Sequence, residues 1–148
     1  KPVLVSEFLI KLAKNFNSIE KNKKSNLEVS AKNCKEFKID EDLFFQVVIN
    51  ITENATHVLE EHQTIRPTIK IEVSKDTENV KISIQDNGPG IPDNIIKSIF
   101  EPFYTTKTVG KGTGLGLAFC KGIIQQHHGS LVVNSMPGET EFVITIPS

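Results

Sequence analysis

Asn50 and Asn54 lie four residues apart in a segment whose apolar residues recur with the period of a helix. At that spacing the two amides share one helix face, close to the apolar stripe, and therefore point partly inward. An inward amide can simply satisfy buried backbone groups, and for a single asparagine that is the simpler interpretation. Two amides beside the small Ala55 favour a cleft instead, and an amide oxygen is a suitable hard ligand for Mg²⁺.

The segment from Asp86 to Gly90 (DNGPG) follows directly after an alternating strand pattern. Gly88 and Gly90 flank a proline, which lets the backbone turn sharply and approach a ligand closely. The Asp86 carboxylate, held at the end of the strand, can accept a hydrogen bond from an exocyclic amine. Taken alone, the segment is more simply a tight turn, because D-N-G is common turn chemistry.

A glycine-rich run, 110–117 (GKGTGLGL), opens directly into a predicted helix. Backbone amides without side chains, together with a helix N-terminus, form an anion site. A flexible hinge is the alternative, but four glycines at alternating positions before a helix are a costly way to make one. The run matches neither a P-loop nor a dinucleotide fingerprint, because the required G-K-S/T and the preceding strand are missing. Phosphate binding is therefore favoured.

The elements that must position these residues are predicted from hydrophobic periodicity. Helices are expected over 4–20 with Ser6 as a cap, after Asp40 as far as Leu59, and from 113–115 to before Gly129. Strands are expected at 27–29, 69–73, 80–84, 131–133 and 142–146. Three helices and about five strands in mixed order indicate an α/β sandwich with the helices layered on one sheet.

The composition excludes several classes of function. The 148 residues carry 17 Lys+Arg against 18 Asp+Glu, a formal net charge of -1, which gives nucleic-acid binding no electrostatic support. No apolar run approaches the ~20 residues of a membrane helix, no signal peptide is evident, and the two cysteines match no metal or redox spacing. We therefore expect one domain over 1–148 in a cytoplasmic setting, without direct membrane contact. Since the sequence does not begin with Met, a piece of a longer protein is expected.

Four motifs in this order, N-x-x-x-N-A, D-x-G-x-G, F-E-P-F-Y-T-T-K and G-x-G-L-G-L, resemble the catalytic ATP-binding domain of sensor histidine kinases. These domains belong to the wider Bergerat-fold (GHKL) group, which includes gyrase, mismatch-repair and chaperone ATPases. The resemblance covers nearly the whole chain and implies a two-layer α/β sandwich. In it, about three helices pack on a mixed, mostly antiparallel five-stranded sheet with a long ATP lid. The F box at 100–107 favours kinases over the other branches.

The resemblance also implies a role for each matching residue. Asn54 would coordinate Mg²⁺ with Asn50 beside it, Asp86 would bind the adenine amino group, and Thr140 would lie near the adenine. Residues from Ile91 to Lys111 would form the lid, docked by Phe100 and Phe103. The ATP-binding residues would be Asn50, Asn54, His57, Asp86, Gly88, Gly90, Ile91, Phe103, Thr105, Thr106, Lys107, Lys111, Gly112, Thr113, Gly114, Leu115, Gly116, Leu117 and Thr140. For Lys107 and Lys111 individually, a solvated lysine is about as good an interpretation as a phosphate contact.

Three positions depart from the family pattern. His57 stands where the family often has Lys or Arg, so a phosphate contact there becomes pH-dependent. Val58 stands where an aromatic often covers the adenine, and Glu139 replaces the second glycine of the last box. A similar P-G-x-T-x-F ending occurs in kinases of the nitrogen-regulator type, so the last departure is interpreted as a subclass mark.

The phosphoacceptor histidine is missing from this chain. None of His57, His62, His127 and His128 lies in an H-E-x-x-x-P context, and the last two are expected to be exposed at a helix end. The resemblance therefore implies an ATP-binding half that donates to a histidine on a separate dimerisation domain and, indirectly, serves a response regulator. The isolated domain would be monomeric. Asn50 occupies the place of the Glu that activates water in hydrolysing relatives, so slow intrinsic hydrolysis is expected; Glu53 is a rival that points elsewhere on the helix.

Two other functions stay open on the sequence alone. The first is a regulatory nucleotide-binding module without transferase activity, which the His57, Val58 and Glu139 departures support. The second is an ATPase or an anti-sigma-type serine kinase of the same fold, which the F box argues against.

Overall fold

The computed structural model describes residues 2–19, 24–101 and 116–148. In chain order, the elements within these residues are β1 (Pro2–Leu4), α1 (Val5–Ser18), β2 (Asn26–Lys32), β3 (Glu36–Lys38), α2 (Glu41–Glu61), β4 (Thr68–Lys75), β5 (Asn79–Asp86), α3 (Asp93–Ile96), α4 (Gly116–Gln126), β6 (Ser130–Met136) and β7 (Glu139–Pro147). The predicted helices and strands are all present. Two three-residue strands and the short α3 are additions.

The five longer strands form one sheet in the order β2-β4-β5-β7-β6. Only the β2–β4 pair is parallel among them, so the predicted mixed, mostly antiparallel sheet is confirmed. The central strand β5 is paired with β4 on one side and β7 on the other. Its last residue, Asp86, faces Ile69 in β4 and Thr140 in β7. The order therefore brings together residues that are far apart in the sequence.

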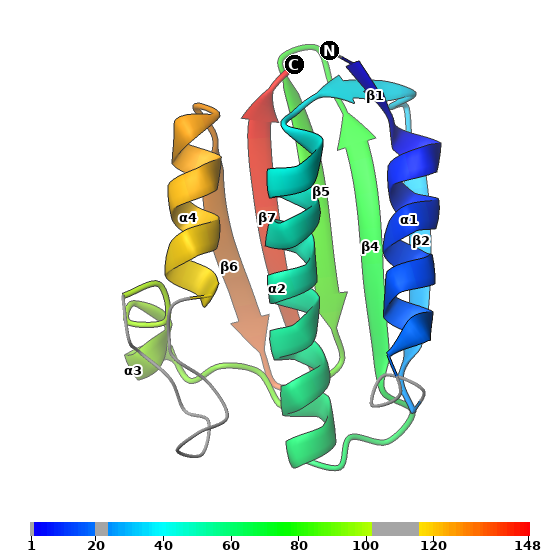
Figure 1. Cartoon of the computed structure of the whole chain (residues 1–148). Helices are drawn as coiled ribbons and strands as arrows, with labels where there is room; N and C mark the ends of the chain where they lie inside the picture. The colour runs from blue at the N-terminus through cyan, green and yellow to red at the C-terminus, as the bar shows by residue number, and fades with distance from the viewer. Residues whose placement is uncertain (1, 20–23, 102–115) are drawn as a thin grey trace.

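Three helices, α1, α2 and α4, cover one face of this sheet (Figure 1). The alternating apolar residues of the strands face these helices, as the period-two pattern predicts. Burying each large apolar side chain contributes roughly 1.5–3 kcal/mol. The largest fully buried side chains are Phe8, Phe44, Leu12, Ile51, Leu59, Ile69, Ile71, Ile82, Ile84, Ile124, Ile144 and Val5. Because α2 and β5 contribute to this core, it fixes the position of the polar residues that lie at its edge.

The first helix begins differently from the prediction. Its N-cap is Leu4, no side chain caps it, and Ser6 lies inside the first turn. The expected Ser6 cap is therefore wrong. The Val5 amide instead donates to the Lys35 carbonyl over 3.0 Å, where β1 pairs with β3. The backbone just before β3 thus satisfies one of the amide donors that the start of a helix leaves without an intrahelical partner.

The second helix begins after Asp40, as predicted, and Asp40 is its N-cap. Asp40 Oδ1 accepts from the Leu43 amide over 3.1 Å, as an N-cap aspartate does. The backbone amide of Asp40 also donates to His127 Nε2 over 3.4 Å, and the His127 ring packs edge-on against Phe44 at 4.7 Å. His127 is therefore half-buried and joins the end of α4 to the start of α2, so its expected exposure is wrong. No helix in the described ranges could cross a membrane.

Candidate functional site

Asp86 lies at the end of the central strand and is 8% exposed. Its Oδ1 atom accepts a hydrogen bond of 2.9 Å from the Gly88 amide. Burial raises the pKa of Asp86 above its ordinary value, and the Gly88 bond offsets part of that shift. The Gly88 amide uses only one of the two carboxylate oxygens of Asp86. The other oxygen can accept a hydrogen bond from a ligand that carries an N–H donor.

The two glycines of the DNGPG turn let it approach its neighbours closely. A Cβ at Gly88 would lie 2.9 Å from Asp86 Oδ1 and 3.4 Å from Leu59 Cδ2, between the turn and α2. Gly90 has φ +89°, and a Cβ there would lie 2.6 Å from the Met136 carbonyl oxygen. The turn therefore needs both glycines in order to lie against α2 and β6.

Asn87, between these residues, ties the turn to the loop that precedes β4. Its Oδ1 atom accepts from the Thr68 amide over 2.8 Å, and its Nδ2 atom donates to the Arg66 carbonyl over 3.0 Å. Arg66 has a positive φ of 51°, an unusual conformation for a residue other than glycine. Sequence reasoning missed this role, because both partners lie about 20 residues away.

An Asn87→Ala variant is expected to lose about 1–3 kcal/mol of unfolding free energy, because two backbone groups lose their partner. Urea unfolding would measure this loss. Asn94→Ala, at another asparagine in the segment after the turn, is the control and should have little effect. Equal stability of the two variants would contradict the assigned role of Asn87.

Thr140 lies opposite Asp86 in the β5–β7 register and is 4% exposed. Its hydroxyl lies 3.1 Å from Ser135 Oγ, which in turn accepts from the Ile91 amide over 2.6 Å. The structure thus brings Asp86, Thr140, Gly90 and Ile91 to one end of the sheet, as their predicted roles require. Ser135 was not predicted, since a lone serine in a strand carries no motif.

The two asparagines lie on α2, and both are half-buried. Asn50 is engaged, because its Oδ1 accepts from Gln46 Nε2 over 3.0 Å. The Cys120 thiol of α4 donates to the Val47 carbonyl of the same helix α2 over 3.5 Å. Burial raises the pKa of that thiol to about 12, so Cys120 stays neutral at pH 7. Among the residues described, none hydrogen-bonds the Asn54 side chain. Of the two amide oxygens, that of Asn54 is therefore the one open to a ligand.

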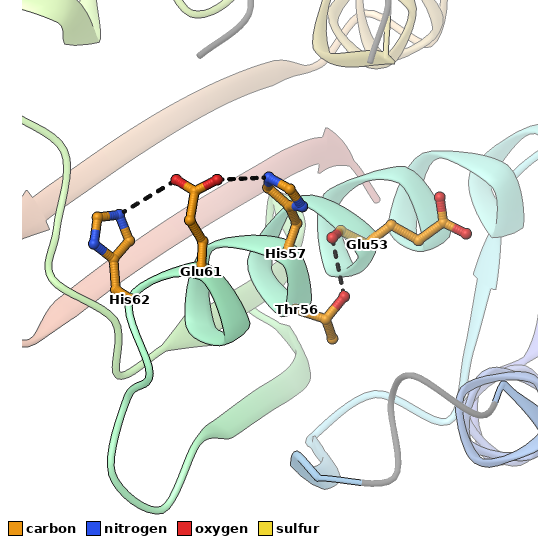
Figure 2. Close-up of polar contacts among 5 residues, drawn as sticks. All are labelled: Glu53, Thr56, His57, Glu61 and His62. Carbon is orange, nitrogen blue, oxygen red and sulfur yellow. Dashed lines mark hydrogen bonds and ion pairs between the residues drawn. The ribbon is translucent and has the colours of Figure 1, made fainter. Parts of the chain in front are cut away.

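His57 follows Asn54 by one turn and contacts Glu61 (Figure 2). The distance from His57 Nε2 to Glu61 Oε2 is 3.2 Å, but the two atoms do not have the geometry of a hydrogen bond. His62 Nε2 lies 3.8 Å from the other carboxylate oxygen of Glu61. Glu61 thus stands between two imidazoles, and an anion bound at His57 would compete with it. Glu53 extends its carboxylate away from His57 and Glu61 (Figure 2).

The first part of the predicted lid lies at the end of the molecule opposite to the two termini, where α3 is found (Figure 1). Phe100 packs edge-on against Phe142 at 6.3 Å, and the Lys121 ammonium lies 5.5 Å from the Phe100 ring centre. Gly116 and Leu117 begin α4. Outside the described residues lie Phe103, Thr105, Thr106, Lys107, Lys111, Gly112, Thr113, Gly114 and Leu115.

The donor set can be compared with the needs of Mg²⁺. This ion binds hard oxygen ligands and usually keeps several waters beside phosphate oxygens, so it needs few protein ligands. The Asn54 amide oxygen meets that need. Among the described residues no group of three or more His, Cys, Asp or Glu could hold a metal ion, so a metal bound mainly by the protein is not supported there. The residues present therefore fit an ion that arrives with a nucleotide.

Comparison with known families agrees with this geometry. Residues 39–148 match the family described as histidine kinase-, DNA gyrase B- and HSP90-like ATPases. The chain belongs to this ATPase family. A family of ATPases implies ATP as the nucleotide.

Curated relatives of this ATPase domain are sensor kinases. Sporulation kinase E of Bacillus subtilis is 44% identical over 103 residues, which cover 69% of this chain and 13% of the relative. The sensor histidine kinase ZraS of Escherichia coli O157:H7 is 37% identical over 113 residues, which cover 76% of this chain and 23% of the relative. The chain therefore spans less than a quarter of the length of either relative.

Solved structures confirm the predicted fold class. The nucleotide-free catalytic domain of histidine kinase ThkA aligns with 99% of this chain and 96% of its own, with TM-score 0.80 and 29% identity. Full-length ShkA in complex with AMPPNP has TM-score 0.85 and 24% identity, and the match covers 99% of this chain and 30% of that chain. At that identity the second likeness concerns the fold alone.

Proposed function

We propose that this chain binds ATP with Mg²⁺ and donates the γ-phosphoryl group to a histidine on a separate dimerisation domain in two-component signalling. The observation that carries the proposal is the buried Asp86 acceptor, which lies opposite Thr140 in the sheet. The turn that follows Asp86 lies against α2, the helix that carries Asn54. Membership of the ATPase family and the sensor-kinase relatives support the same conclusion.

In this proposal the adenine lies at the end of β5. Asp86 accepts from the exocyclic amine, and Thr140 lies beside the ring. Gly88 lets the base approach Asp86, because a Cβ there would lie 2.9 Å from Asp86 Oδ1. Gly90 lets the turn lie against β6, because a Cβ there would lie 2.6 Å from the Met136 carbonyl oxygen. Ile91, whose amide is held by Ser135, begins the lid.

The phosphates then extend toward α2 and the lid. Asn54 would hold Mg²⁺, which neutralises charge on the phosphate oxygens when bound. Asn50, fixed by Gln46, supports this arrangement, and His57 contributes a positive charge when it is protonated. Residues proposed to wrap the triphosphate or dock the lid are Phe103, Thr105, Thr106, Lys107, Lys111, Gly112, Thr113, Gly114, Leu115, Gly116 and Leu117.

Phosphoryl transfer requires positioning and charge neutralisation more than covalent chemistry from the protein. The nucleophile is the nitrogen of the acceptor histidine, which attacks the γ-phosphorus while ADP leaves. No catalytic base is assigned to this chain, because Asn50 cannot take a proton and Glu53, one residue from Asn54, is expected to point elsewhere on the helix. Slow intrinsic hydrolysis is expected for the same reason.

The partners are the acceptor-bearing dimerisation domain of the same parent protein and, through it, a response regulator. We place the domain in the cytoplasm, whether or not its parent is anchored in a membrane, and expect the isolated domain to be monomeric. Nucleic acid is not a proposed partner, since the net charge is -1.

Transfer can be tested by mixing the chain with Mg²⁺-ATP and a separately produced dimerisation domain that carries the acceptor histidine. Acid-labile phosphate on that domain is expected. An acceptor variant with the histidine replaced by glutamine should stay unlabelled. Absence of transfer at saturating ATP, while ATP still binds, would contradict the kinase activity.

The second candidate is a regulatory module in which ATP orders the lid without phosphoryl transfer. The contact between His57 and Glu61 favours it, because a carboxylate beside the proposed phosphate contact weakens the attraction for a triphosphate. Nucleotide binding without labelling of any cognate histidine domain would support this candidate.

A further inference from the structure

Ser135, near the end of β6, links the lid segment to the buried site. Its Oγ atom accepts from the Ile91 amide over 2.6 Å and lies 3.1 Å from Thr140 Oγ1 and 3.5 Å from the Glu139 carbonyl oxygen. The Gly90 turn lies against the same strand, since a Cβ at Gly90 would be 3.1 Å from Ser135 Oγ. Ser135 therefore occupies a crowded position with a defined set of partners.

The Ser135 hydroxyl has more than one possible acceptor for its hydrogen bond. A serine hydroxyl has one proton to donate and two lone pairs to accept. The Ile91 amide uses one lone pair, and the proton can then reach either Thr140 Oγ1 or the Glu139 carbonyl. The Thr140 oxygen is nearer by the distances above, and 3.5 Å is the outer limit of a hydrogen bond. Either hydroxyl can donate across the 3.1 Å contact between Ser135 and Thr140. We take the arrangement in which Ser135 donates to its nearer partner, Thr140, and Thr140 accepts.

This direction leaves the Thr140 proton free to donate elsewhere. Thr140 is the register partner of Asp86, and both side chains are buried on the helix-covered face of the sheet. Asp86 Oδ1 accepts from Gly88, and the carboxylate keeps a second oxygen as an acceptor. The end of the sheet thus presents an acceptor and a donor side by side.

Adenine and guanine differ in how they match this pair. The adenine edge carries an amino donor beside the N1 acceptor, which complements Asp86 and Thr140. The guanine edge carries the O6 acceptor beside an N1–H donor, so O6 would face the Asp86 carboxylate and N1–H would face the Thr140 proton. A buried polar group that is left unpaired, or that faces a group of the same kind, weakens binding. Guanine would therefore bind more weakly than adenine at this site.

Resting on the proposed ATP binding, we propose that Ser135 is a specificity-determining positioning residue. By donating its proton to Thr140, Ser135 holds the Thr140 hydroxyl as a donor and so favours adenine over guanine nucleotides. Without Ser135, the Thr140 hydroxyl can rotate and accept from guanine N1–H.

The test is calorimetric titration of the 148-residue chain with Mg²⁺-ATP and with Mg²⁺-GTP. The readout is the ratio of the two dissociation constants, because a merely structural loss would weaken both nucleotides alike. Ser135→Ala is expected to reduce the preference for ATP about tenfold. Ser135→Thr keeps the hydroxyl and should retain the preference, as should Ser130→Ala at the exposed start of the same strand.

An unchanged ratio in a folded Ser135→Ala variant would overturn the inference while leaving the proposed function intact. Thr140→Val, which is nearly equal in volume, provides a second measurement if Ser135→Ala fails to fold. It removes the donor itself and should reduce the same preference, and an unchanged ratio there would overturn the inference equally. If the unmodified chain binds neither nucleotide, both the proposed function and this inference are wrong.

Discussion

Replacing Asp86 by asparagine is expected to weaken ATP binding by about 10–100-fold, the range for losing a hydrogen bond to a charged group. The substituted amide would keep an oxygen for the Gly88 N–H, so the turn keeps its bond. The second carboxylate oxygen would be replaced by an NH₂ group. That group and the adenine amine are both donors, so no hydrogen bond forms between them. Calorimetric titration of Mg²⁺-ATP would measure the loss.

The same Asp86→Asn variant is expected to be more stable than the unmodified chain at neutral pH. Burial raises the folded-state pKa of Asp86 above 3.8, so the folded protein binds this proton more tightly than the unfolded chain does. The contribution of Asp86 to stability is therefore fully present below the unfolded pKa and is lost as the pH rises through the folded pKa. The asparagine side chain does not ionise, so the advantage of the variant should grow over that pH window in urea unfolding experiments.

Asp76, in the turn between β4 and β5, is a matched control, because its pKa shift has the opposite sign to that of Asp86. Its carboxylate accepts from the Glu78 and Asn79 amides, and these bonds lower its pKa. Its contribution to stability is present above the unfolded pKa and is lost as the pH falls through the folded pKa. Asp76→Asn should leave ATP affinity unchanged. Equal ATP affinity of Asp86→Asn and the unmodified chain would contradict the adenine role of Asp86.

Replacing Gly90 by alanine is expected to cost more stability than the same change at Gly138. Both glycines have φ +89°, so both variants incur the cost of a left-handed conformation, about 1–2 kcal/mol. A Cβ at Gly138 meets nothing within 4 Å, whereas at Gly90 it would lie 2.6 Å from the Met136 carbonyl oxygen. The backbone must shift to relieve that contact, which adds roughly 1–3 kcal/mol.

Urea unfolding of the two variants side by side separates the contact from the conformational cost. Gly90→Ala should also weaken ATP binding, because the shift moves the turn that holds Asp86 and the Ile91 amide away from Ser135. Gly138→Ala should bind ATP almost normally. If both variants lost the same stability, the close approach of Gly90 to β6 would not be needed.

Much of the fold could be predicted because hydrophobic periodicity is a local property. The alternation at Ile69, Ile71 and Val73 assigns one face of β4 to the core, and those residues are buried. The second helix begins after Asp40, as predicted, and the structure shows that Asp40 caps it. The strands β1 and β3 were missed, because three residues are too few to show alternation. Ser6 was misassigned, because Lys35 from a distant segment satisfies the Val5 amide.

The residues of the candidate site divide in the same way. The sequence by itself determined which residues carry chemistry, because Asp86, Gly88, Asn50 and Asn54 stand in motifs only a few residues long. Their roles toward ATP and Mg²⁺ stay predictions.

Only the tertiary structure decided which of these residues meet. Asp86 and Thr140 are neighbours because β7 lies beside β5, and strand order depends on packing across the whole sheet. Ser135 and Asn87 act through hydrogen bonds to segments distant in sequence, so no local pattern reveals them. Short-range periodicity thus determined the elements and the candidate residues, whereas long-range strand pairing and burial decided their distances and their partners.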